Sequence, residues 1–180
     1  RHYPESMGAL ALAGADLVVV PQAGATGEWP EGLYEAEMQV AAFQKKAREL
    51  GIVTVINLYE RDGVHAYDSS PVIDADGTLL GVTRMIHITD YPCFHEQGYY
   101  TPGDKGAPVF TTKAGRVGVS ICYDRHFPEY MRALAVNGAD LVIVPQAGAV
   151  DEWPEGLYGA EMRVGAFQEG YFIVLSKRVG

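Results

Sequence analysis

The sequence predicts an α/β fold, because apolar stretches with strand-like and helix-like patterns alternate along the chain. Val117, Val119 and Ile121 alternate with small or polar residues, as in a β-strand. Residues 33–50 instead place apolar side chains at helical spacing, and Gly51, a residue type that commonly ends helices, follows them. Strands that alternate with helices favour βαβ units, in which a helix joins parallel strands.

Glycine and proline residues divide the chain into the expected elements. Gly14 closes a first helix, and Pro21 ends the short strand after it. Ala75-Asp76-Gly77 lies between two apolar stretches and predicts a hairpin turn. The expected helices cover residues 4–13 and 33–50 and begin again near Pro128 and Leu157. The expected strands cover residues 17–20, 52–58, 72–74, 78–80, 115–122, 141–144 and 172–175.

An internal repeat accompanies this pattern. Residues 1–44 and 125–168 align without a gap, and 33 of the 44 aligned pairs are identical. Two copies separated by residues 45–124 do not stack as a solenoid does. The repeat indicates either a two-fold pseudo-symmetric domain or a recent duplication, and identity in the loops favours duplication. No linker divides the chain, so we expect a single domain over residues 1–180.

Composition excludes several classes of protein. Apolar residues make up 48% of the chain, too many for a disordered segment. A net charge of -9 argues against a nucleic-acid partner, which needs clustered Lys and Arg. Cys93 and Cys122 are the only cysteines, so we expect no disulfide scaffold, no metal site and a reducing compartment. The chain shows no signal peptide and no run of eighteen apolar residues, and the cytoplasm is the expected location.

Cys122 stands between a predicted strand and a predicted helix. Pro128 and Glu129 suit the first helical turn, so the thiol falls on the connecting turn. A thiol near a helix N-terminus has a lowered pKa and becomes a nucleophile. A small buried apolar cysteine is the alternative interpretation of this stretch alone. Residues 89–108, rich in Pro, Gly, His and Tyr, predict a long loop of the kind that often carries function.

Four ordered motifs resemble those of the nitrilase superfamily, the carbon–nitrogen hydrolases. Val119–Glu129 looks like the nucleophile motif of that family. Glu49–Val53 followed by Tyr59–Asp62 resembles its helix–strand step, and Val72–Gly81 its central hairpin. Phe94–Asp104 resembles its active-site loop. The branch that acts on N-carbamoyl amines, β-ureidopropionase and N-carbamoylputrescine amidase, is the most similar.

The resemblance runs from about Lys45 to Gly180 and implies the overall architecture and activity. The family fold is a four-layer α-β-β-α sandwich. We expect a shortened version here, because the family's first strand and C-terminal strands have no counterpart. The resemblance further implies hydrolysis of a small amide or carbamoyl substrate without a cofactor, and assembly into homo-oligomers. Open sheet edges would also favour pairing with another chain.

The same resemblance assigns candidate site residues. Cys122 matches the nucleophile and Glu96 the second, supporting glutamate. The backbone N–H of Tyr123 would donate to the oxyanion. Arg125 and His126 are candidate substrate-binding residues, although contacts within the turn explain both equally well.

Two positions depart from the family pattern. The lysine that stabilises the tetrahedral intermediate falls at Met85, which carries no charge and donates no hydrogen bond. The glutamate general base falls at Gln22, whose amide exchanges no proton near neutral pH. Strand alternation predicts that Arg84 points away from the side of Met85.

Three hypotheses therefore stand. The first is a thiol-dependent amidohydrolase that forms an acyl-enzyme at Cys122. The second is an impaired or inactive relative, either a pseudoenzyme or the product of a rearranged gene, which keeps the fold and the assembly surface. The third is an unrelated α/β binding module with a merely buried cysteine, which four co-ordered motifs disfavour.

Overall fold

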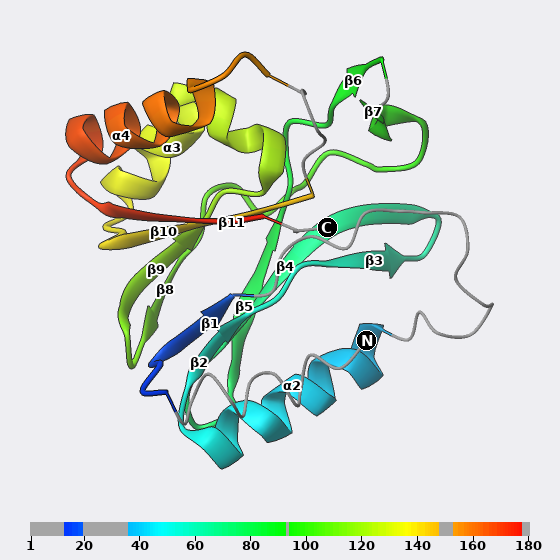
Figure 1. Cartoon of the computed structure of the whole chain (residues 1–180). Coiled ribbons are helices and arrows are strands. Elements are labelled where there is room, and N and C mark those ends of the chain that lie inside the picture. Colours follow the sequence, from blue (N-terminus) through cyan, green and yellow to red (C-terminus); the bar gives the residue numbers. More distant parts are fainter. Residues whose placement is uncertain (1–12, 20–35, 93, 148–152, 178–180) are drawn as a thin grey trace.

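Two β-sheets lie face to face, with helices on their outer faces (Figure 1). The computed structural model describes residues 13–19, 36–92, 94–147 and 153–177. Helix α2 covers one sheet, and helices α3 and α4 cover the other. This order of layers is the α-β-β-α sandwich that the motifs imply. The expected helix over residues 4–13 lies outside the described residues.

The first sheet is built around one long strand, β4, which pairs with three others. Its elements are β1 (Leu17–Val19), α2 (Ala36–Leu50), β2 (Val53–Val55), β3 (Leu58–Asp62), β4 (His65–Ile73) and β5 (Leu79–Arg84). β1 and β2 run parallel, whereas β2, β3 and β5 are antiparallel to β4. The predicted hairpin is confirmed: β4 and β5 meet at Gly77, whose φ of 84° requires glycine-like freedom.

The expected strand over residues 52–58 is wrong in one respect. The structure interrupts it after Val55, and β3 then continues in the same direction, with both strands antiparallel to β4 in one register. Asn57 lies between the two and donates to the carboxylate of Asp68 (2.7 Å) and to the hydroxyl of Ser70 (3.1 Å). These side-chain bonds stand where the backbone ladder is interrupted, and the strand direction is the same on both sides of the interruption.

The second sheet has the order β11-β10-β9-β8 and confirms the βαβ prediction. Its elements are β8 (Val109–Thr112), β9 (Gly115–Val119), α3 (Pro128–Val136), β10 (Leu141–Gln146), α4 (Leu157–Glu169) and β11 (Phe172–Lys177). β9, β10 and β11 run parallel and are connected through α3 and α4. The predicted long loop holds the two-stranded pair β6 (Asp90–Tyr91) and β7 (Phe94–His95) and the 3-10 helix η1 (Glu96–Gly98).

The repeated segments occupy corresponding places in the two sheets. Leu17 of β1 aligns with Leu141 of β10 in the repeat, and each begins a strand. In both sheets a helix follows, α2 or α4, and then a parallel partner strand, β2 or β11. This correspondence is expected both for a pseudo-symmetric domain and for a duplicated segment.

Three apolar clusters hold the layers together. One lies between α2 and the first sheet and includes Phe43 and Ala47; another lies under α3 and includes Met131 and Leu134. The inter-sheet cluster consists of Val55, Ala66, Val72, Met85, Ile88, Tyr100, Val117, Val119, Ile121, Cys122 and Ile143. Cys122 therefore stands where the two sheets meet. No helix within the described ranges is both long and apolar enough to cross a membrane.

Candidate active site

Cys122 occupies a strained turn directly beyond β9. It opens the 3-10 helix η2 (Cys122–His126), and α3 begins at Pro128. Its φ of 46° is the only positive φ among the described residues other than glycine. Such backbone strain persists only where the surroundings enforce it, and nucleophiles on sharp strand–helix turns are a known example. Cys122 is 5% exposed, so the turn keeps this residue almost completely buried.

Asp124 connects this turn to the segment that follows β5. Its carboxylate is fully buried and accepts hydrogen bonds from the backbone N–H of His87 (2.9 Å) and of Ile86 (3.3 Å). The ring Nδ1 of His87 lies 2.7 Å from the same Oδ1 atom. Burial raises the pKa of the Asp124 carboxyl, and the bonds from His87 and Ile86 act in the opposite direction. The Cys122 turn and residues 85–88 are thereby fixed to one another.

Met85 and Arg84 face opposite sides, as strand alternation predicts. Met85 is fully buried in the inter-sheet cluster that includes Cys122. The guanidinium of Arg84 instead forms ion pairs with Glu60, Asp62 and Asp104. The positive charge of Arg84 therefore does not substitute for the lysine charge that the resemblance leads us to expect at Met85.

Glu96 lies in η1 with its side chain buried. Burial first, and then the negative charges of Asp68 and Glu96, raise the pKa of the Tyr100 phenol. The carboxylates of Asp68 and Glu96 therefore both raise the pKa of Tyr100. Asp68 was not a sequence candidate; its fully buried carboxylate is recognisable only from the structure. No clear signal marked it in the sequence, because the strand that carries Asp68 also contains His65, Ser69 and Ser70.

Arg125 hydrogen-bonds back to the turn that holds Cys122. Its Nη1 atom donates to the carbonyl oxygen of Cys122 (2.6 Å), and its guanidinium stacks over Tyr158 at 4.6 Å. His126 contacts α4 as well, through Nδ1 and Glu161 (2.5 Å). Neither of these candidates is among the residues that line the adjacent cavity.

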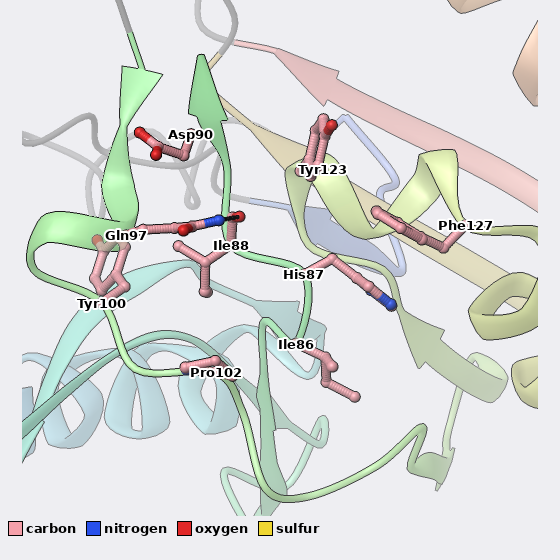
Figure 2. A pocket seen from close by; sticks show the side chains of 9 residues that line it. All are labelled: Ile86, His87, Ile88, Asp90, Gln97, Tyr100, Pro102, Tyr123 and Phe127. Carbon is pink, nitrogen blue, oxygen red and sulfur yellow. Dashed lines mark hydrogen bonds between the residues drawn. The ribbon is translucent and has the colours of Figure 1, made fainter.

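A cavity of about 580 Å³ opens beside the turn that holds Cys122 (Figure 2). Tyr123 and Phe127 come from the segment that follows Cys122, whereas Tyr100, Gln97 and Asp90 come from the long loop. The remaining lining residues are Ile86, His87, Ile88 and Pro102. A cavity of this size, lined by aromatic and aliphatic side chains together with polar ones, can hold a small molecule. Of the sequence candidates, Tyr123 lines it.

The structure does not describe two residues that stand out in the sequence. Gln22 and Cys93 lie outside the described residues. Within the described part of the chain, no group of three His, Cys, Asp or Glu side chains is placed to hold a metal ion.

The chain matches one protein family and several curated relatives. The model of the carbon-nitrogen hydrolase family matches residues 5–180. N-carbamoylputrescine amidase of Arabidopsis thaliana is 41% identical over 124 residues, which cover 69% of this chain and 42% of the relative. β-Ureidopropionase of the same plant is 36% identical over 140 residues, covering 76% of this chain and 34% of the relative. The chain thus spans less than half the length of these curated relatives.

Solved structures match nearly the whole chain. A carbon-nitrogen hydrolase from Helicobacter pylori G27 gives a TM-score of 0.87 at 29% identity, covering 99% of this chain and 68% of its own. A glutamate-to-glutamine mutant of an amidase from Nesterenkonia sp. AN1 gives 0.84 at 25% identity, covering 99% and 71%. That structure shows acrylamide added to the active-site cysteine.

Proposed function

The chain belongs to the carbon–nitrogen hydrolase family, and from that premise we propose that Cys122 cleaves the C–N bond of a small N-carbamoyl amine or linear amide. The observation that carries the proposal is the backbone of Cys122. Its positive φ, at the end of a strand and beside a cavity, is the geometry of a presented nucleophile. A buried structural cysteine needs no such strain.

The proposed reaction passes through a thioester. The thiolate of Cys122 attacks the carbonyl carbon, and the backbone N–H of Tyr123 donates to the developing oxyanion. Collapse of the tetrahedral intermediate expels the leaving nitrogen, and water then hydrolyses the acyl-enzyme. Glu96, buried in the loop that borders the cavity, is the proposed supporting carboxylate.

The substrate class follows from the relatives and the cavity. The names of the curated relatives specify N-carbamoylputrescine and the β-ureidopropionase substrate, which are both small carbamoyl compounds. A cavity of about 580 Å³ accommodates molecules of that size. Arg125 and His126 support the turn and the contact with α4 in this proposal, and Tyr123 contacts the substrate.

We also propose a homo-oligomer in the cytoplasm. Phe167 of α4 and Phe172 of β11 are 89% and 80% exposed, and β11 lies at the end of its sheet in the described part of the chain. Exposed aromatic side chains beside an open strand edge favour association with another chain.

Product release tests the proposal directly. The chain should release ammonia or amine from at least one member of a panel of N-carbamoyl amines, N-carbamoyl amino acids and linear amides. Cys122→Ala should abolish that release. Equal rates for the two proteins would contradict the proposal. A wild-type chain whose Cys122 takes up acrylamide without any turnover would instead identify the impaired relative.

A further inference from the structure

His87 is held in one orientation beside the nucleophile turn. Its Nδ1 atom lies 2.7 Å from the buried carboxylate of Asp124. One face of the ring stacks on Phe127, with centroids 3.6 Å apart and an angle of 9° between the planes, as Figure 2 shows. Tyr130 approaches edge-on at 6.2 Å. The ring is therefore fixed by a hydrogen bond and by aromatic packing.

The other nitrogen of this ring remains available. Nε2 of His87 has no hydrogen-bond partner among the described residues, and the side chain is 29% exposed. His87 is also one of the residues that line the cavity. An imidazole with Nδ1 held by a carboxylate and Nε2 open is arranged for proton transfer.

We propose that His87 and Asp124 form the proton-transfer pair of this active site, with His87 as the catalytic residue and Asp124 as the residue that positions it. The inference rests on the proposed function. The chain needs such a pair because Met85 carries no proton and an amide at Gln22 exchanges none. Asp124 lies two residues beyond Cys122, so nucleophile and positioning carboxylate belong to the same short helix.

His87 Nε2 carries the proton in both half-reactions of the proposed pathway. Nε2 of His87 takes the proton of the Cys122 thiol, directly or through one water, and leaves a thiolate. The C–S bond forms, and the electron pair of the carbonyl π bond moves to oxygen. The C–N bond then breaks as the imidazolium returns its proton to the leaving nitrogen. In deacylation Nε2 takes a proton from water, the hydroxide displaces sulfur, and the thiol is reprotonated.

The groups around His87 determine the expected pH dependence. Asp124 and Tyr123 face it from η2, and Tyr130 faces it from α3. Across the cavity, Asp90 and Tyr100 are the other titratable residues. None of the described residues that line the cavity is Lys or Arg. Asp124 is the one of these groups that hydrogen-bonds to the ring, so it fixes the orientation of His87.

His87→Asn separates structure from catalysis. The asparagine Nδ2 atom can still donate to Asp124, whereas no proton acceptor remains at the position of Nε2. We expect kcat to fall by about 10²-fold or more with KM little changed, because general acid–base catalysis contributes about 10² to 10⁴-fold. The limb of the kcat/KM profile that depends on His87 should disappear as well.

His65→Asn is the matched control, because His65 is exposed and its Nδ1 contacts only the Thr101 hydroxyl, at 3.3 Å. It should keep the wild-type rate and pH profile. A His87→Asn variant that keeps both would overturn the proton-transfer role. If it does so while Cys122→Ala is inactive, the proposed hydrolase stands without this inference.

A second measurement decides the matter if His87→Asn fails to fold or if no substrate is turned over. The titration of His87 can be followed by NMR in the wild type and in Cys122→Ser. A coupled pair requires the His87 midpoint to shift when the thiol is removed. An unchanged midpoint would overturn the inference, whatever the activity of the chain.

Discussion

The guanidinium of Arg125 donates a hydrogen bond of 2.6 Å to the carbonyl oxygen of Cys122, three residues before it. The Arg125 side chain is 1% exposed. This buried bond therefore holds the strained turn, and Arg125 is not among the residues that line the cavity. Residues that hold a strained backbone are as necessary to a nucleophile as the groups that contact the substrate.

Replacing Arg125 with Met should weaken both stability and turnover. The substitution removes the buried donor to the Cys122 carbonyl and the guanidinium beside Glu161, which keeps only its contact with His126, at a cost of about 1–3 kcal/mol. Urea denaturation gives the free energy of unfolding. Arg116→Met is the control, because its ion pair with Asp140 is half exposed and contributes about 0–1 kcal/mol. Equal losses for the two variants would contradict the special role of Arg125.

Met85→Lys should raise turnover and lower stability. The new ammonium would enter the inter-sheet cluster that includes Cys122, where it could stabilise the thiolate and the tetrahedral intermediate. Its desolvation is costly because Met85 is fully buried. Adding Gln22→Glu should raise the rate further. The comparison is of kcat and of the thermal midpoint.

Ile73→Lys is the control for this change. Ile73 is equally buried but packs in the cluster on the α2 side. It should lose stability without any gain in rate. If Met85→Lys gains nothing either, the match of Met85 to the family lysine is wrong.

The ion pairs of Arg84 should make the protein sensitive to acid. Desolvation raises the pKa of Glu60, but hydrogen bonds from Arg84 and Ser69 outweigh it, and the net pKa lies below the ordinary 4.5. A depressed carboxyl pKa contributes stability that is present above the unfolded-state value and is lost as pH falls through the folded-state value. The free energy of unfolding should therefore fall below about pH 4.5.

Glu60→Gln should make that fall less steep. Urea denaturation at a series of acidic pH values, compared with the wild type, measures the slope. Glu49→Gln is the surface control, since its pair with Lys46 is exposed to solvent and screened. The same slope in Glu60→Gln and the wild type would show that this network is not the acid-sensitive element.

Gly103 allows the active-site loop to approach β5 closely. A Cβ atom at this position would lie 2.3 Å from the carbonyl oxygen of Arg84. Gly103→Ala should therefore displace the loop that carries Tyr100 and reduce stability by about 1–3 kcal/mol. Gly98→Ala in the same loop meets nothing within 4 Å and should be nearly neutral. Thermal unfolding of the two variants makes the comparison.

The sequence was most informative where local signals and tertiary packing agree. Pro128 at the first turn of α3 and Gly51, with a φ of 66° after α2, mark the helix boundaries that the structure shows. The hairpin of β3 and β4 escaped prediction because residues 59–62 are mostly polar. Their charged side chains pair with Arg84, a contact more than twenty residues away that no local pattern reveals.

Contacts between residues distant in the sequence also determine the candidate site. The position of Cys122 on a turn follows from the strand before it and the proline after it. The contact of Asp124 with His87 joins residues 37 apart, so only the folded chain reveals it. Asp68 is similar, because its burial depends on the packing of one sheet on the other.

Alkylation of Cys122 as a function of pH tests the central claim most directly. Iodoacetamide labelling, read by peptide mass spectrometry, compares Cys122 with Cys93 in the same folded chain. An activated nucleophile should be labelled well below about pH 8, where an ordinary thiol is mostly protonated, and much faster than Cys93. Equal, slow labelling of both cysteines, rising only near the pKa of a free thiol, would contradict the account.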